Sequence, residues 1–245
     1  MRIVSYNIRF GGDHRTAFIG AVLASLEPDV VLLQEATDPQ AVDRIAHASG
    51  LEHVYRRPGW SVAAVLREPA RGHEWHRPGR SRGFLEVVPQ GDGRIRLIGL
   101  HLPAGLSGRG ERARLRAVDT LLDWAGGQAD DHTVLMGDLN SVARGDAPRV
   151  ASMPLWIRLL LRFDGGIRTD VHDRLADAGW VDAYRYLHPD DPGFTLPAVS
   201  PQVRLDYTLV PAAMVARVAA CAPAADAVGA ARASDHLPLV TVIES

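Results

Sequence analysis

Eight polar or charged residues lie beside apolar, strand-like runs, although they are far apart in the chain. Open sheets of α/β proteins place ligand groups at the ends of strands, so residues scattered over a whole chain can meet in one cleft. Carboxylates, amides and imidazoles gathered in this way predict a metal-dependent site that cleaves phosphoesters. The eight residues are Asn7, Glu35, His101, Asp138, Asn140, Asp206, Asp235 and His236.

The oxygen-bearing side chains of this set suit a hard divalent cation. A phosphodiester hydrolyses very slowly in water, so a catalyst must neutralise its nonbridging oxygens, supply a nucleophile and stabilise the leaving oxygen. Mg²⁺, or Mn²⁺ in its place, needs only one or two carboxylates because it keeps several of its waters. Glu35 is the first candidate ligand, since it follows the apolar run 30–34. Asn7 can add a neutral oxygen or orient Glu35, and Asp235 is a further candidate.

The remaining residues suit proton transfer and phosphate binding. His236 is a candidate general base because imidazole titrates near neutral pH, and Asp206 can hold its other ring nitrogen. Asp138 can bind the attacking water or the metal, and the choice of base between it and His236 stays open. Asn140 can donate to a nonbridging oxygen. His101 can donate to the same phosphoryl group or protonate the leaving oxygen.

Hydrophobic periodicity predicts the elements that must position these residues. The short apolar runs and the hairpin signal over residues 90–93 indicate antiparallel pairing, so we expect a mixed sheet in a single domain spanning residues 1–245. The predicted strands cover 2–8, 30–34, 62–66, 84–88, 95–100, 133–137, 203–210, 214–221 and 238–243. The predicted helices cover 16–26, 39–49, 110–125, 154–163 and 171–178.

The composition is that of an ordinary globular protein. Of 245 residues, 47% are apolar and 23% charged, and the net charge of −2 gives no overall attraction to nucleic acid. The chain has no lysine, so its 27 basic residues are all arginine. The single Cys221 suits a reducing compartment, no signal peptide is visible, and no apolar run approaches the roughly 20 residues that span a bilayer. We therefore expect a cytoplasmic protein without a transmembrane segment.

Six short motifs that contain these residues occur in a consistent order along the chain. Together they resemble the motifs of the endonuclease/exonuclease/phosphatase superfamily, which includes pancreatic-type deoxyribonucleases, apurinic-site endonucleases, neutral sphingomyelinases and inositol polyphosphate 5-phosphatases. Each motif alone is weak, whereas six in order over nearly the whole chain are specific. The motifs are Ser5-Tyr6-Asn7-Ile8-Arg9, Leu33-Gln34-Glu35, Leu100-His101-Leu102, Gly137-Asp138-Leu139-Asn140, Arg204-Leu205-Asp206-Tyr207 and Ser234-Asp235-His236-Leu237-Pro238.

The resemblance implies a deoxyribonuclease-like fold, a four-layer α/β sandwich of two mixed β-sheets flanked by helices. It also implies divalent-metal dependence and in-line attack of water on phosphorus. His101 matches a position that apurinic-site enzymes fill with Tyr, which favours the deoxyribonuclease, sphingomyelinase or phosphatase branches. By motif, the implied metal-binding residues are Asn7, Glu35 and Asp235, and the implied residues of the water, phosphate and histidine sites are Asp138, Asn140, Asp206 and His236.

Structural roles compete with these functional ones. Asn7 can cap a turn, Glu35 can cap a helix, and Asp138 with Asn140 can form an Asx turn. An aspartate such as Asp206 inside an apolar strand is harder to explain structurally, because an unpaired buried carboxylate is costly. The joint occurrence of all eight favours the functional interpretation.

The expected function is hydrolysis of a phosphodiester in nucleic acid. The alternatives are a phospholipid (sphingomyelinase-like) or inositol-phosphate hydrolase, and, less favoured, a non-catalytic binding module on the same scaffold. A zinc hydrolase is also less favoured, because the histidines do not form the usual zinc set. Segment 154–163 combines apolar residues with two arginines, so an interfacial lipid contact competes there with a packed helix.

Two further groups are expected to be solvated. An arginine cluster in the predicted helix 110–125 is interpreted as an exposed face, with binding of an extra phosphate as the alternative. Five histidines lack ligand-like spacing and are expected at the surface. The arginines are Arg109, Arg112, Arg114 and Arg116, and the histidines are His73, His76, His132, His172 and His188.

Overall fold

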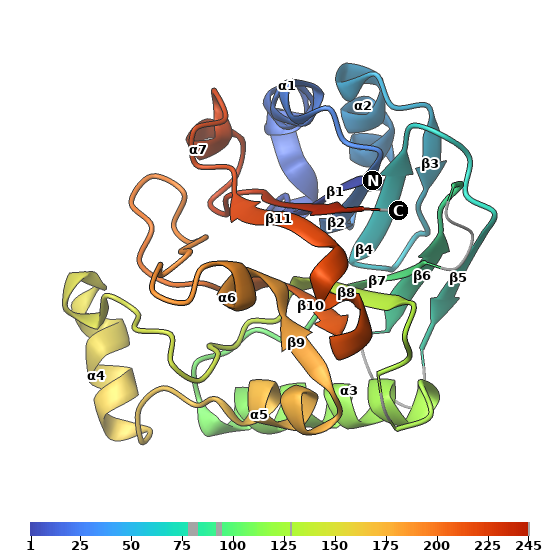
Figure 1. The fold of residues 1–245 in the computed structure, drawn as a ribbon. Helices are drawn as coiled ribbons and strands as arrows, with labels where there is room; N and C mark the ends of the chain where they lie inside the picture. The colour runs from blue at the N-terminus through green and yellow to red at the C-terminus, as the bar shows by residue number, and fades with distance from the viewer. Residues whose placement is uncertain (78–82, 92–94, 128, 245) are drawn as a thin grey trace.

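Two six-stranded β-sheets pack face to face, and helices cover their outer faces (Figure 1). The computed structural model describes residues 1–77, 83–91, 95–127 and 129–244. Each sheet has one parallel pair of strands at its centre, and its other neighbours are antiparallel. The two sheets therefore share one pattern, in which the central strands end at the same edge.

The first sheet combines strands from both ends of the chain. Its central strands β1 and β2 are parallel, with Asn7 paired to Gln34, so Asn7 and Glu35 emerge side by side. Strand β2 is buried along its whole length, as expected for a continuous apolar run with helices on one side and a sheet on the other. The strand order is β11 (Val218–Pro223), β12 (Leu239–Ile243), β1 (Arg2–Asn7), β2 (Val30–Gln34), β4 (Val62–Leu66) and β3 (His53–Tyr55).

The second sheet is built from the middle of the chain. Its central strands β7 and β8 are parallel, and β10 returns antiparallel beside β8. The strand order is β5 (Gly72–His76), β6 (Phe84–Val88), β7 (Arg96–His101), β8 (Thr133–Asp138), β10 (Asp206–Pro211) and β9 (Trp180–Asp182).

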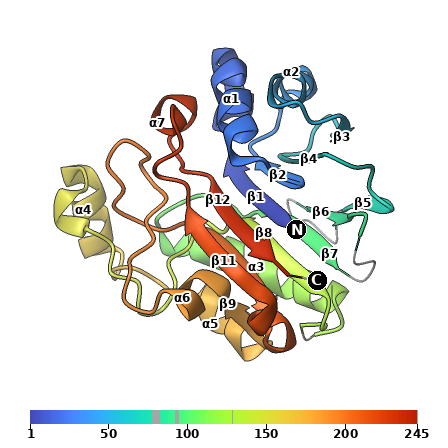
Figure 2. The ribbon, with the colours of Figure 1, turned by 45° about the horizontal axis from the view of Figure 1, so that its top comes forward.

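Helices pack on the outer face of each sheet. Those on the first sheet are α1 (Thr16–Leu26), α2 (Pro39–Ser49) and the short α7 (Ala230–Ala233), and those on the second are α3 (Gly108–Trp124) and α5 (Asp170–Asp177). Both ends of helix α2 are capped. The Asp38 side chain accepts a hydrogen bond from the Gln40 amide at its start, and Gly50 takes a left-handed conformation at its end. Two helices lie elsewhere (Figure 2): α4 (Leu155–Phe163) at the periphery and α6 (Ala183–Leu187) beside β9 and β10. Three 3₁₀ segments complete the described elements: Phe10–Arg15, Val150–Ser152 and Ala212–Arg217.

Three hydrophobic clusters fill the spaces between the four layers. The one between the sheets contains Leu32, Leu97 and Met136, and the outer ones join each sheet to its helices. Alternate residues of β2 point into different clusters, since Leu32 faces the other sheet and Leu33 faces the helices. Burial on both faces fixes the register of the central strands, and with it the position of the residues at their ends.

The expected fold class, two mixed sheets flanked by helices, is confirmed. The prediction of a strand over 214–221 is wrong in its first half, because residues 212–217 form a 3₁₀ turn before β11 begins at Val218. Short edge elements such as β3 and β9 went unpredicted. Half of the hairpin signal over 90–93, residues 92 and 93, lies outside the described residues, although β6 and β7 do pair antiparallel. No helix in the described ranges is long and apolar enough to cross a membrane.

Candidate active site

Strand β8 places Asp138 between two of the other predicted site residues. Asp138 pairs in register with His101 on the parallel strand β7 and with Asp206 on the antiparallel strand β10. The His101 Nε2 lies 3.9 Å from the Asp138 Oδ2. Register alone therefore gathers three groups that are far apart in sequence.

Gly137 allows the close approach on which this arrangement depends. Its φ of 150° is one that L side chains rarely adopt, and a Cβ built there would lie 2.0 Å from the carbonyl oxygen of Leu100. A side chain at this position would push β8 away from β7, and with it Asp138 away from His101.

His236 and Asp206 form a buried acid–imidazole pair. The His236 Nδ1 lies 2.8 Å from the Asp206 Oδ2, which leaves Nε2 facing the Asp138 Oδ2 at 3.9 Å. The loop before β12 holds His236 in place, because the Ser234 hydroxyl donates to the carbonyl of Asn7 at 2.6 Å and accepts from the His236 amide at 3.3 Å. The pair thus joins the first sheet to the second.

Asn7 connects the carboxylates of the two sheets. Its Nδ2 donates to the Asp138 Oδ2 at 2.9 Å and reaches the Glu35 Oε1 at 3.3 Å. The other oxygen of Glu35 accepts from the Phe10 amide at 2.6 Å, so the loop after β1 folds over this carboxylate. These contacts place Glu35 at one rim of the site, while Asp138 lies at its buried centre.

Asn140 and Asp235 occupy the outer part of the site. The Asn140 amide nitrogen donates to the Asp138 Oδ1 at 2.8 Å, and its side chain donates to the carbonyl of Leu102 at 3.1 Å. The Asp235 carboxylate lies 3.4 Å from the Arg9 guanidinium. All eight sequence-predicted residues therefore surround one location, hereafter the acid–histidine cluster.

Backbone strain is concentrated in the same place. Glu35 and Asn140 have φ values of 55° and 48°, and Arg9 and Phe10 have 52° and 49°. These are left-handed conformations, which are uncommon for residues other than glycine and cost about 1–3 kcal/mol each. The surrounding hydrogen bonds hold Glu35 and Asn140 in these orientations.

Burial and crowding of acids control the electrostatics of the cluster. Burial raises the pKa of Asp138 to about 7, with the negative charge of Asp206 acting in the same direction and His236 opposing it. Burial alone would lower the pKa of His236, but the charge and hydrogen bond of Asp206, together with Asp138, raise it to about 10. The pKa values of Asp138 and His236 are therefore both raised, so both groups bind protons more strongly than they do in water.

The donor set fits a divalent cation that keeps its waters. Four carboxylates share a single arginine contact, that of Arg9 with Asp235, and the buried Asp206 Oδ1 has no hydrogen-bond partner in the described part of the chain. No three His, Cys, Asp or Glu side chains among the described residues are arranged as a group that could hold a metal ion. Mg²⁺ needs no such group, because one or two carboxylates and water suffice. Glu35, Asp235 and Asn7 are the residues that fit this use.

A cavity of about 620 Å³ opens directly beside the cluster. Asn140 and Asp235 line its inner end, and helix α4 forms part of its outer wall. Most of the other lining side chains are apolar, and the sequence patterns did not predict this cavity. The apolar lining includes Leu106, Val142, Met153, Ile157, Leu161 and Leu196.

A second group of acids lies next to the cluster, and arginines bind it. We call it the arginine network. Arg204 is fully buried, and its guanidinium binds Asp146 at 2.9 Å and Asp182 at 2.6 Å. Arg185 binds the same Asp146 oxygen at 2.7 Å, and the ring of Tyr207 lies 4.4 Å from the Arg204 guanidinium. Because Arg204 precedes Asp206 by two residues, the network fixes the start of β10. The sequence signal for this network was Arg204, which lies two residues before the apolar strand β10.

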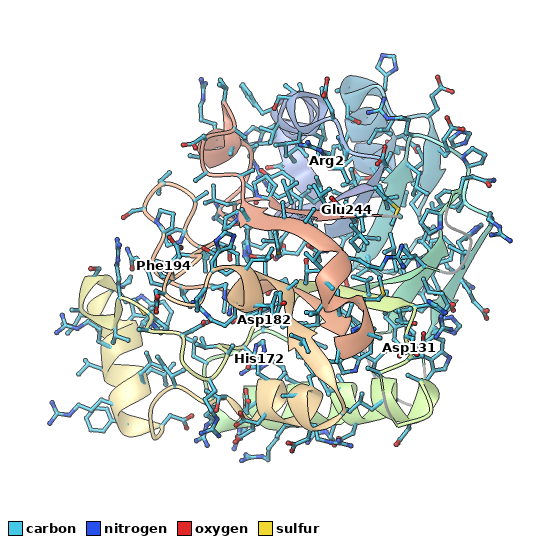
Figure 3. The ribbon with its side chains drawn as sticks, in the orientation of Figure 1. Arg2, Asp131, His172, Asp182, Phe194 and Glu244 are labelled. Atoms are coloured by element: carbon cyan, nitrogen blue, oxygen red, sulfur yellow. The ribbon has the colours of Figure 1, made fainter. Side chains whose placement is uncertain are left out.

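Two expectations about surface residues are wrong. Arg114 is buried and forms an ion pair with Glu111 at 2.7 Å, and its Nη1 donates to the carbonyls of Pro103 and Gly105 in the loop after His101. His172 is buried beneath the sheet, where its ring lies 4.2 Å from that of Tyr207. Figure 3 shows its side chain below that of Asp182, between α6 and α5.

The two packed sheets and the acid–histidine cluster define a hydrolase of the phosphoester-cleaving class. The model of the Endonuclease/Exonuclease/phosphatase family matches residues 4–236, and the chain belongs to this family. The resemblance expected from the six motifs is confirmed. No curated protein sequence matches the chain.

Solved structures share the fold over the full length of both chains. A 3′ phosphatase from Neisseria bound to a product DNA hairpin has 19% identity and a TM-score of 0.76, and a 3′–5′ exonuclease from Neisseria meningitidis has 19% and 0.73. An AP endonuclease from Archaeoglobus fulgidus has 20% identity and a TM-score of 0.76. Each covers 100% of this chain and is itself covered to 100%. At these identities the similarity shows the fold alone.

Proposed function

We propose that this chain, as one catalytic domain over residues 1–245, hydrolyses phosphodiesters with the help of Mg²⁺ or Mn²⁺. One observation carries the proposal: acids, amides and histidines from the two sheets meet around a single location where, among the described residues, four carboxylates share one arginine, Arg9. A structural role would neutralise these acids with arginines, as the neighbouring network does. A site that binds a cation has to keep its carboxylates free of such arginines.

Glu35, Asn7 and Asp235 are the proposed cation-binding residues. A bound Mg²⁺ supplies neutralisation of the phosphate oxygens. Glu35 lies at the rim, where its carboxylate is held by the Phe10 amide and the Asn7 side chain. Asn7 also donates to Asp138, so it keeps the two carboxylates apart in fixed orientations.

His236 and Asp138 are the proposed pair that holds the attacking water. Because the pKa of His236 is raised to about 10, its protonated ring orients the water and Asp138 is the proposed base. Their Nε2 and Oδ2 atoms face each other at 3.9 Å, so one water can contact both. Asp206 fixes the ring through Nδ1, which directs Nε2 toward the site. Asn140 and His101, which both lie beside the Asp138 Oδ2, are the proposed donors to the phosphoryl oxygens.

Nucleic acid is the first proposed substrate. One of the structures with the same fold is bound to a product DNA hairpin. At the rim of this site the side chain of Arg9 is 49% exposed and Phe10 is 74% exposed, with the guanidinium over the ring. An exposed cation and an exposed ring suit a backbone phosphate and an unstacked base.

A phospholipid or lipid-linked inositol phosphate is the second candidate, and the cavity favours it. The space beside Asn140 and Asp235 is lined mostly by apolar side chains. Such a wall stabilises an apolar group attached to the phosphate, whereas a sugar–phosphate backbone gains little from it.

The test is a panel of phosphoesters incubated with purified protein: plasmid, single-stranded RNA, sphingomyelin vesicles, inositol phosphates and a generic soluble diester. EDTA should abolish cleavage and Mg²⁺ should restore it. Glu35→Ala should reduce the rate by orders of magnitude, whereas Glu52→Ala, which removes an exposed glutamate elsewhere, should leave it unchanged. Cleavage that persists in EDTA, or a Glu35→Ala variant as fast as the wild type, would contradict the proposal.

A further inference from the structure

Helix α4 exposes an unusual amount of apolar surface. Leu155, Trp156 and Phe163 are 63%, 64% and 81% exposed, and Leu161 is the helix's one buried residue. Figures 1 and 2 both show the helix at the edge of the molecule, away from the two sheets. Single exposed apolar residues are ordinary, but a contiguous group containing two large aromatic rings indicates a binding surface.

The exposed residues form one face of the helix. Trp156, Leu159 and Phe163 recur at the three- and four-residue spacing that aligns side chains along a helix. The opposite face, with Ile157 and Leu161, lines the cavity that leads to Asn140. The inner face therefore forms part of the cavity wall, and the outer face is a second, exposed apolar surface on the same helix.

Two arginines flank the outer face one turn apart. Arg158 and Arg162 are exposed, and neither forms an ion pair with a carboxylate of the described residues. Exposed arginines in other elements do have such partners, for example Arg56 with Asp43 and Arg144 with Asp173. A chain with a net charge of −2 thus carries a local positive charge beside two exposed aromatic residues, Trp156 and Phe163.

We propose that the outer face of α4, formed by Leu155, Trp156, Leu159 and Phe163 with Arg158 and Arg162 at its flank, docks on an anionic lipid membrane. Aromatic and aliphatic side chains beside arginine are the composition of helices that lie in the membrane interface. Anionic lipid headgroups complement the two arginines.

The alternative occupants fit this surface less well. A nucleic acid would satisfy the arginines and could stack on the rings, but it would leave Leu155 and Leu159 in contact with water or phosphate. A second copy of the chain would need roughly 800 Å² from each partner, far more than one face of a nine-residue helix about 13 Å long provides. A lipid surface needs only shallow insertion of the same side chains.

Docking would hold α4 between the membrane and the cavity, because one face of the helix would contact the lipid and the other lines the cavity. The inference goes beyond the proposed hydrolysis, since the surface would bind lipid even in a protein whose site is inactive. The two can therefore fail separately.

The experiment is flotation of the full chain with two kinds of vesicle, pure phosphatidylcholine and phosphatidylcholine mixed with phosphatidylserine. We expect binding to the anionic vesicles and at least tenfold weaker binding to the neutral ones. Trp156→Ser/Phe163→Ser and Arg158→Gln/Arg162→Gln should each weaken anionic binding at least tenfold. These side chains are exposed, so the fold should survive, and circular dichroism checks this.

Matched controls remove similar groups elsewhere. Val228→Ser, at a residue 90% exposed beside α7, and Arg112→Gln/Arg116→Gln, on the exposed face of α3, should bind vesicles as the wild type does. Glu35→Ala should also bind normally, which separates docking from hydrolysis.

Several outcomes would overturn the proposal. These are a wild type that floats with neither vesicle, a wild type that floats equally with both, and α4 variants that bind as well as the wild type. If the same substitutions instead weaken plasmid binding or abolish a dimer seen by sedimentation velocity, the occupant is nucleic acid or a second copy.

Discussion

The acid–histidine cluster and the arginine network contain similar residues but differ in charge balance. In the network, Asp146 and Asp182 are bound by Arg204, and Arg185 completes the set. Burial alone would raise the pKa of Asp146, but hydrogen bonds and charge from Arg204 and Arg185 hold it below its ordinary value. In the cluster, burial raises the pKa of Asp138. The pKa values of buried aspartates in the two acid-rich regions are therefore shifted in opposite directions.

The difference separates acids that maintain the fold from acids that are available for chemistry. Buried carboxylates are stable when arginines neutralise them, and the Asp146 side chain is only 1% exposed. In the cluster only Asp235 has an arginine partner in the described part of the chain, Arg9, whereas Glu35 and Asp138 have none there. This arrangement costs stability and leaves carboxylate oxygens free for a cation. Positions that lower stability in this way are typical of active sites.

The largest expected effect concerns His236. His236→Ala should lower the rate of phosphoester cleavage by about 10²–10⁴-fold, because it removes the group that faces Asp138 and orients the attacking water. His172→Gln is the matched control, since it replaces the buried histidine beside the arginine network and should keep the rate. Steady-state kinetics with the soluble diester measures both. Equal losses in the two variants would contradict the distinction between the regions.

Stability should respond oppositely to matched aspartate substitutions. Asp146→Asn leaves Arg204 and Arg185 without their shared carboxylate and should lower the free energy of unfolding by about 3 kcal/mol. Asp138→Asn in EDTA at pH 8 keeps an acceptor for the Asn140 amide but loses the acceptor of the Asn7 side chain. Removal of the crowded charge should at least offset this loss, so stability should be unchanged or about 1 kcal/mol higher. Urea unfolding measures both. Similar destabilisation by the two substitutions would mean that both aspartates are structural.

The pH dependence of the free energy of unfolding should show the effect of the lowered pKa of His172. Burial lowers the pKa of this histidine from 6.5 to about 4, so the folded protein holds it neutral. Between these two pH values the unfolded chain binds a proton that the folded protein does not, and stability falls as the pH falls. The loss reaches at most about 3 kcal/mol near pH 4. His172→Gln should flatten the urea-unfolding profile over this window, and an unchanged slope would exclude the histidine as its source.

The sequence was sufficient for the fold class, which the resemblance of the six motifs implied, and for the residues that meet in the cluster. Apolar runs such as 30–34 define buried strands, and polar residues at their ends must then gather at one edge. Asn7 and Glu35 follow directly from the parallel pairing of β1 and β2. The positions of short elements could not be predicted, because edge strands such as β3 carry little hydrophobic pattern.

The sequence patterns could not predict contacts between polar residues that are far apart in the chain. Arg114 has the spacing of an exposed helix face, yet Glu111 and two loop carbonyls bury it. His172 and Arg204 likewise depend on partners far along the chain. The cavity beside Asn140 arises from how α4 is placed relative to the loop 196–205, and periodicity gives no measure of that placement.

Calorimetric titration of the metal-free protein with Mn²⁺ tests the central claim most directly, because it needs no substrate. The account predicts one cation-binding process in the wild type that is lost or at least tenfold weaker in Glu35→Ala and retained in Asp146→Asn at a temperature where that variant is folded. Binding that is absent from the wild type, or equally strong in Glu35→Ala, would contradict it.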